Sequence, residues 1–162
     1  MNFLSAEEIN QSSPYKVTQV DDLSVRFCTR KGVHYWVGFT VDIFILTENG
    51  YYLYLVNESE TQGEDPLVYQ TVVAIIANFF AHSTSDAMLY ICSPSDNKQA
   101  ARARLFKRWF DKTEGTENFT LSTYSNIEKG VEYFYGMILR KDNPYHDKMI
   151  RIFIDFLSDI EN

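Results

Sequence analysis

The sequence predicts an α+β protein, in which a mixed, mostly antiparallel sheet is flanked by helices. Two observations carry this prediction. Runs that alternate apolar and polar residues, typical of strands with one buried face, fill much of the first third of the chain and recur near its end. Between and after them lie three stretches with helical periodicity. Taken in chain order, these segments predict the arrangement β-β-β-α-β-α-β-β-α.

The first three strands follow from residue types and turns. The runs LSVRFCTR (23–30) and VHYWVGFTV (33–41) are rich in β-branched and aromatic residues and flank Lys31-Gly32. Two such runs around a glycine-containing turn predict a β-hairpin. After the turn TENG, the run GYYLYLVN (50–57) predicts a third strand.

A buried helix and a central strand come next. Asp65 is a suitable N-cap and Pro66 suits the first helical position, so a helix begins there. Its sequence, PLVYQTVVAIIANFFA, leaves little polar face and predicts a mostly buried helix. The short apolar run AMLYICS (87–93) predicts a strand inside the sheet.

A second hairpin and a final helix complete the order. The runs FTLSTYSNI (119–127) and VEYFYGMILRK (131–141) flank Lys129-Gly130, and Asn143-Pro144 begins a C-terminal helix over 143–162. The apolar stripe of this helix either packs deeply or is shared with a partner. The second alternative predicts a homodimer through Met149, Ile152, Phe153, Phe156 and Ile160.

Composition sets the class and the expected compartment. The chain has 162 residues, 45% of them hydrophobic and 23% charged, which suits one domain over 1–162 with residues 1–14 frayed or forming a short helix. The start MNFLSAEEIN lacks a basic leader, and no apolar run is long enough to span a membrane. We therefore expect a cytoplasmic protein with no membrane contact, whose Cys28 and Cys92 are free thiols.

Charge is unevenly distributed along this acidic chain, whose formal net charge is −7. Residues 1–65 hold ten acidic and four basic residues, whereas residues 97–112 hold six basic residues and one acid. The overall acidity argues against nucleic-acid binding by the whole surface, although the local basic patch stays a candidate for it.

The basic segment 98–112 predicts an amphipathic helix with Asp96 as its cap. At about 100° per residue, its apolar face consists of Leu105, Phe106, Trp109 and Phe110. A basic ridge on another face consists of Arg104, Arg108 and Lys112. We interpret the ridge first as the solvated side of the helix.

Arg102 falls within the predicted apolar face of this helix, and a buried guanidinium needs a partner. One alternative is an internal salt bridge to an acid of the loop 58–65. The other is an anion site at the helix start, made by Ser95, Lys98 and Arg102 with the exposed backbone N–H groups.

No residue is predicted to be catalytic or to bind a metal. Cys92 precedes the basic helix, where a thiol is either activated by a lowered pKa or simply buried. The three histidines, His34, His82 and His146, are scattered without an HExxH pair, and the acids of 58–65 match no metal-binding pattern.

Two resemblances add expectations. The stretch NFFAHSTSDAMLYICSPSDNKQAARARLFKRWF (78–110), with YWVGF (35–39) upstream, resembles an uncharacterised bacterial domain-of-unknown-function family. The pattern rests on a Tyr-Ile-Cys strand at 90–92, a Ser/Asp-rich turn at 93–96, and a helix with Gln99, Arg102, Trp109 and Phe110. No activity is implied by this resemblance.

The order of elements resembles the core of the GCN5-related N-acetyltransferases, and DNKQAARARLFKRWF is similar to their penultimate helix. The resemblance implies a pyrophosphate-binding loop at NESETQGEDP, but this loop has one glycine, four acids and Pro66, which lacks an N–H donor. The general-acid tyrosine of the family would fall at Phe106, which has no hydroxyl.

These observations together predict a non-catalytic binding or interaction module on a degenerate acetyltransferase-like core, without a cofactor. One alternative is an atypical N-acyltransferase that uses acetyl-CoA. A second is a nucleic-acid-binding protein that uses the basic helix 97–112.

Overall fold

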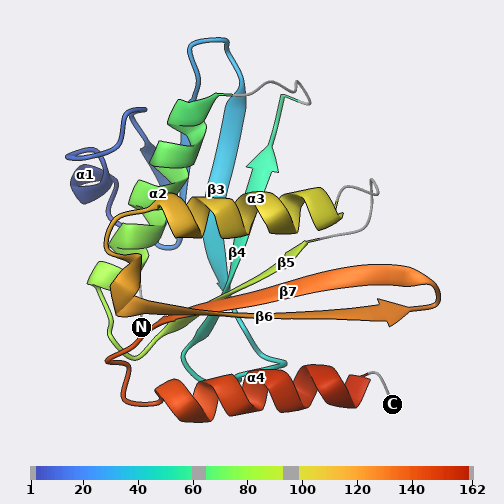
Figure 1. The fold of residues 1–162 in the computed structure, drawn as a ribbon. Helices are drawn as coiled ribbons and strands as arrows, with labels where there is room; N and C mark the ends of the chain where they lie inside the picture. Colours follow the sequence, from blue (N-terminus) through green and yellow to red (C-terminus); the bar gives the residue numbers. More distant parts are fainter. Residues whose placement is uncertain (1–2, 60–64, 93–98, 161–162) are drawn as a thin grey trace. The chain divides into compact units, whose positions relative to one another are not determined.

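The computed structural model describes residues 3–59, 65–92 and 99–160 (Figure 1). The strands are β1 (Thr18–Asp21), β2 (Ser24–Cys28), β3 (His34–Val41), β4 (Gly50–Asn57), β5 (Ala87–Cys92), β6 (Phe119–Glu128) and β7 (Val131–Arg140). The helices are α1 (Ala6–Ile9), α2 (Pro66–Ala81), α3 (Gln99–Lys112) and α4 (His146–Ile160), with a short 3-10 turn at Thr116–Asn118.

The α+β class is confirmed, and the strands form a seven-stranded mixed sheet in the order β1-β2-β3-β4-β5-β7-β6. The pairs β1–β2, β2–β3, β5–β7 and β6–β7 are antiparallel, whereas β4 and β5 run parallel. The parallel pairing joins residues 50–52 to residues 87–89. The predicted order lacks β1, whose four residues are all exposed and therefore show no alternation of buried and exposed positions.

The chain divides into two compact units, each assembled from two separate stretches. The first consists of Met1–Thr40 and Leu53–Thr84, and the second of Val41–Tyr52 and Ser85–Asn162. Strand β4 thus contributes its first residues to the second unit and its remaining residues to the first.

The first unit is built around α2. As predicted, the Asp65 side chain caps this helix by accepting a hydrogen bond from the Leu67 N–H at 2.9 Å, and Pro66 occupies the first turn. The ring of Phe79 on α2 stacks on Phe39 of β3 with centroids 4.3 Å apart, and both rings are buried. The predicted cap of the helix is therefore confirmed, and seven of its sixteen residues are buried.

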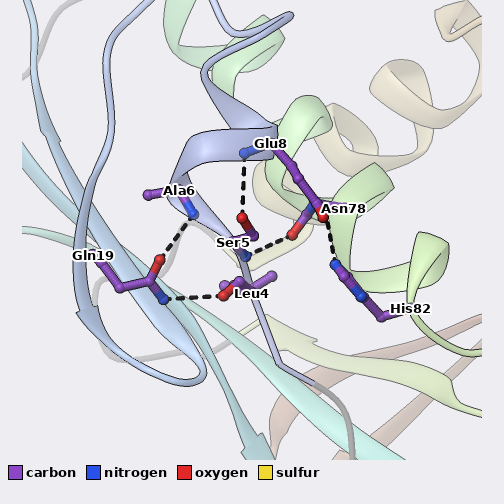
Figure 2. A network of polar contacts seen from close by, with 7 residues as sticks. All are labelled: Leu4, Ser5, Ala6, Glu8, Gln19, Asn78 and His82. Atoms are coloured by element: carbon purple, nitrogen blue, oxygen red, sulfur yellow. Dashed lines mark hydrogen bonds and ion pairs between the residues drawn. The ribbon is translucent and has the colours of Figure 1, made fainter.

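A polar network fixes α1 to α2 in this unit (Figure 2). The Asn78 side chain accepts a hydrogen bond from the Ser5 N–H at 2.9 Å and donates one to the Glu8 carboxylate at 2.8 Å. His82 Nε2 lies 2.9 Å from the same carboxylate oxygen. The hydrogen bonds from Asn78 and His82 lower the pKa of Glu8.

The second unit places α3 and α4 on opposite faces of the strands β5, β7 and β6 (Figure 1). Leu89 on β5 faces the core beneath α4, and its neighbour Tyr90 points the other way, onto Phe106 of α3. The buried core beneath α4 consists of Ile45, Leu46, Ala87, Leu89, Met137, Leu139, Met149, Phe153 and Leu157.

The loop between β3 and β4 closes this core around a buried carboxylate. Asp42 is 0% exposed, and its oxygens accept hydrogen bonds from the N–H groups of Phe44, Ile45 and Leu46 at 2.9, 3.0 and 2.6 Å. This arrangement directs Ile45 and Leu46 into the core and leaves Ile43 and Phe44 exposed.

None of the helices in the described ranges combines the length and the apolar character needed to cross a membrane.

Candidate functional site

The residues predicted to form an anion site divide into two groups. Ser95 and Lys98 lie outside the described residues, as does the predicted cap Asp96. Arg102 lies in α3 and is exposed, so the prediction that it falls within a buried apolar face is wrong.

Cys92 is buried, and burial raises the pKa of its thiol, against a smaller opposing effect of the Arg102 charge. Of the two alternatives, the buried thiol is confirmed and the activated one is wrong. A thiol with a raised pKa holds little thiolate at neutral pH and is a poor nucleophile.

The face of α3 that contacts the sheet agrees only in part with the predicted one, because Phe106, Trp109 and Phe110 are half-buried. Phe106 stacks on Tyr90 with ring centroids 4.0 Å apart, but Leu105 is 39% exposed. Ala100 and Ala103, which lie on the same side as Phe106, face the sheet across a cleft.

Glycine at position 136 makes the close approach of α3 possible. Gly136 pairs with Tyr90 across β5 and β7, and a Cβ atom at this position would lie 2.0 Å from the Tyr90 ring. The ring therefore lies over the glycine and supports Phe106. At the helix start, the Gln99 side chain donates a hydrogen bond to the Glu132 carbonyl of β7 at 3.0 Å.

The cleft lies between α3 and the β6–β7 hairpin and has a volume of about 330 Å³. Its walls combine small, aromatic, hydroxyl and basic residues from one compact unit. The lining residues are Tyr90, Ala100, Ala103, Arg104, Lys107, Thr123, Tyr124, Ser125, Phe134 and Tyr135.

Two basic side chains, those of Arg104 and Lys107, line this cleft. Arg104 and Lys107 are both exposed and lie three residues apart, on neighbouring positions of one helix face. Lys107 also forms an exposed ion pair with Asp111 at 3.4 Å, an interaction that is weak in water. Of the predicted basic ridge, Arg104 lines the cleft, whereas Arg108 and Lys112 are exposed and are not among its lining residues.

The side chains that line the cleft are basic, hydroxyl-bearing, aromatic or small. Among the described residues that line it there is no Cys, His, Asp or Glu to act as a nucleophile or general base at neutral pH. Burial raises the pKa of Tyr90 and keeps its phenol protonated. What the cleft offers is two positive charges, the hydroxyls of Thr123 and Ser125, and an aromatic wall.

Residues with catalytic chemistry meet elsewhere, in an arrangement the sequence did not indicate. His146 Nε2 lies 2.8 Å from the Thr120 hydroxyl, and its Nδ1 lies 2.8 Å from the Asp147 carboxylate. The Asp147 side chain is 92% exposed, so water competes for it. The backbone N–H of His146 donates a hydrogen bond to the Asn143 carbonyl. The contact between Thr120 and His146 joins the start of α4 to β6.

A cysteine and a histidine also meet in the first unit. Cys28 Sγ on β2 lies 3.8 Å from His34 Nε2 on β3. Cys28 is an exposed free thiol, and its sulfur also lies 3.4 Å from the Thr29 carbonyl. Within the described ranges, no group of three or more His, Cys, Asp or Glu residues could hold a metal ion.

The apolar stripe of α4 is largely committed to the core. Met149 and Phe153 are 4% and 0% exposed, and Ile152 and Phe156 are partly buried against the same core. The first two are therefore not accessible to a partner, which supports the deep-packing alternative for them. The side chain of Ile160 lies outside the described part of the chain.

The positions suggested by the acetyltransferase resemblance are occupied by structural contacts. The Asp65 carboxylate caps α2 and accepts a hydrogen bond from the Tyr15 hydroxyl. Phe106 stacks on Tyr90. Most of the acidic loop, residues 60–64, lies outside the described residues.

The structure thus defines an α+β protein with a basic-rimmed cleft beside α3. Comparison with known families shows that the chain belongs to a family of unknown function (DUF6169), whose model matches residues 64–155. The matched segment includes every residue that lines the cleft. No curated protein matches the chain.

Proposed function

We propose that the protein is a non-catalytic binding module that holds an anionic ligand in the cleft beside α3. The observation that carries this proposal is the pairing of Arg104 and Lys107 with the hydroxyls of Thr123 and Ser125 around one cleft. Positive charges and hydroxyl donors complement carboxylate or phosphate oxygens. The aromatic wall supplies apolar contact, as in most ligand sites.

The core of this module is, in our proposal, an acetyltransferase-like fold that no longer binds CoA. The element order from β2 to β7 supports the likeness. The capping role of Asp65 and the missing hydroxyl at Phe106 support the loss of the acetyl-transfer chemistry. The free thiols of Cys28 and Cys92 suit a reducing compartment, the cytoplasm.

The test is thermal unfolding of the full chain against four probes: inorganic phosphate, a poly-glutamate peptide, acetyl-CoA and a short DNA strand. A probe at about 100 times its Kd adds about 2.7 kcal/mol of stability, a shift of about 5–10 °C for a chain of this size. We expect a shift with the glutamate peptide that disappears in Arg104→Ala/Lys107→Ala.

The matched control is Arg108→Ala/Lys112→Ala, which removes the same charges from the same helix outside the cleft. It should retain the shift. Equal loss in both variants would indicate that the whole basic helix binds, as expected for nucleic acid. A shift confined to acetyl-CoA would favour an acyltransferase instead.

A further inference from the structure

The strand β6 presents an unpaired edge. It is the last strand in the sheet order, and no other described strand pairs with its outer side. In an antiparallel pair, successive residues direct their N–H and C=O groups alternately toward and away from the partner. The Lys141 N–H donates to the Asn118 carbonyl at 2.9 Å, which places the even-numbered positions of β6 on the β7 side.

The odd-numbered positions 121, 123, 125 and 127 therefore direct their backbone N–H and C=O groups outward from the sheet. The closing turn agrees with this register, because Lys129 and Gly130 both have positive φ, as in the two-residue turns that follow a hydrogen-bonded pair. The result is a row of eight backbone groups along one edge.

Natural edge strands are usually protected from pairing by charges, prolines, bulges or short length. β1, at the other edge, has four residues and a register shift. β6 has ten residues paired to β7 without a shift, and it contains no Lys and no Pro. Its single charged residue is Glu128, at the hairpin end. The edge of β6 is therefore open to another strand.

The cleft runs beside this edge. The side chains of Thr123 and Ser125 are exposed and line the cleft together with Ala100 and Ala103 of α3. The two alanines keep the space between helix and strand open. A strand added to β6 would direct every second side chain into this space, toward Arg104 and Lys107.

We propose that β6 and α3 together bind an extended acidic peptide of a partner protein, which joins the sheet as an additional strand. This inference rests on the proposed function, since the anionic ligand is the peptide itself. Backbone hydrogen bonds along β6 supply affinity, and the cleft supplies selectivity for acidic side chains at alternate positions. Residues 121–127 span about 20 Å, the length of about seven extended residues.

A second copy of the chain is a poorer occupant. Pairing of two β6 strands would bring in only one charged residue from the partner strand, Glu128. Glu128 is at an even position and shares the face of Tyr124, which packs on the α4 side. It would not reach Arg104, so a second copy would bring no acidic side chain of β6 to the basic residues of the cleft.

The first experiment selects peptides from a random seven-residue display library on the full chain. We expect enriched peptides with acidic residues at alternate positions. Synthetic copies should bind at least about tenfold more weakly to Arg104→Ala/Lys107→Ala, whereas Arg108→Ala/Lys112→Ala should bind within about twofold of the wild type.

The second experiment tests strand addition by amide hydrogen exchange. Peptide binding should slow exchange at the outward amides of Leu121, Thr123, Ser125 and Ile127 and leave those of the even positions unchanged. N-methylation of alternate peptide amides should abolish binding to the wild-type chain. Ser125→Pro, which removes an outward N–H and leaves the β7 ladder intact, should have the same effect.

The outcomes separate the two proposals. If acidic peptides bind through Arg104 and Lys107 but the outward amides and N-methylation have no effect, strand addition is wrong and the proposed function stands. If the outward amides become protected by self-association without peptide, the occupant is a second copy and the inference is overturned. If neither peptides nor the anionic probes bind, both proposals are wrong.

Discussion

At the scale of single residues, Asp42 determines whether the β3–β4 loop can close the core. Its carboxylate accepts three backbone hydrogen bonds and a hydrogen bond from the Tyr52 hydroxyl, whose pKa is raised by burial and by Asp42. A buried N–H group that loses its acceptor costs about 1–3 kcal/mol.

We therefore expect Asp42→Ala to lower the free energy of unfolding by roughly 3–5 kcal/mol, measured by urea titration. Asp22→Ala, at an exposed turn, should change it by less than about 0.5 kcal/mol. A loss at Asp42 as small as that at Asp22 would show that water replaces the carboxylate.

Glu8 gives the stability of the first unit a dependence on pH. The hydrogen bonds from Asn78 and His82 lower the pKa of Glu8 below its ordinary value of 4.5. A carboxyl group with a lower pKa in the folded state stabilises fully above its unfolded pKa, and this contribution is lost as the pH falls through the folded pKa.

The difference in unfolding free energy between wild type and Glu8→Gln should therefore be present at pH 6 and shrink below pH 4.5. Chemical unfolding at a series of pH values measures this difference, with Glu7→Gln at the adjacent exposed position as control. A difference that is constant across the series would contradict the prediction.

At the scale of elements, the position of α3 depends on the contact between Gly136 and Tyr90. A methyl group at 136 would displace the Tyr90 ring and, through it, Phe106. Gly136→Ala should cost about 1–3 kcal/mol of stability, as overpacking does. It should also change the fluorescence of Trp109, which lies beside Phe106.

A double-mutant cycle provides the control. In a Tyr90→Leu background the ring is gone, so Gly136→Ala should cost less than in the wild type. Equal costs in both backgrounds would show that the ring and the glycine do not interact.

The position of α3 also shows where sequence patterns succeed and fail. The helix itself follows from its periodicity, and its predicted limits agree with Gln99–Lys112. Its sheet-facing side was predicted only in part, because Phe106, Trp109 and Phe110 are half-buried but Leu105 is exposed. Ala100 and Ala103, which contribute little to a hydrophobicity pattern, line the cleft. Arg102 was predicted on the apolar face although it is exposed.

The cleft could not be predicted from sequence. Thr123 and Ser125 are ordinary polar residues of an alternating strand, and only the pairing of β6 with β7 brings them opposite α3. Gly136 could have indicated that another group packs closely on this strand, because glycine inside a strand often marks such a close approach. The partner in that approach, Tyr90, is 46 residues away in sequence.

At the scale of the whole molecule, the open edge of β6 predicts how the protein aggregates. Ile127 is 67% exposed at the outer end of this strand. A lysine on an edge strand opposes pairing with another chain, so Ile127→Lys should reduce light scattering on heating. The midpoint of unfolding should stay nearly unchanged, since the site is exposed.

Val20→Lys is the matched control, because Val20 is 40% exposed on the short edge strand β1. It should leave scattering as in the wild type. Equal protection by both variants would show that net charge, and not the β6 edge, governs aggregation.

The second unit is assembled from two separate stretches of the chain. It therefore matters which part of the gene a recombination event transfers. The family match begins at residue 64, after the loop that carries Asp42, Ile45 and Leu46. A recombination event that transferred only the matched segment would carry α3, β6 and the cleft, but the core beneath α4 would lack Ile45, Leu46 and Leu157. We therefore expect the cleft to be retained in a descendant when the stretch that encodes residues 41–52 passes together with the one that encodes residues 85–162.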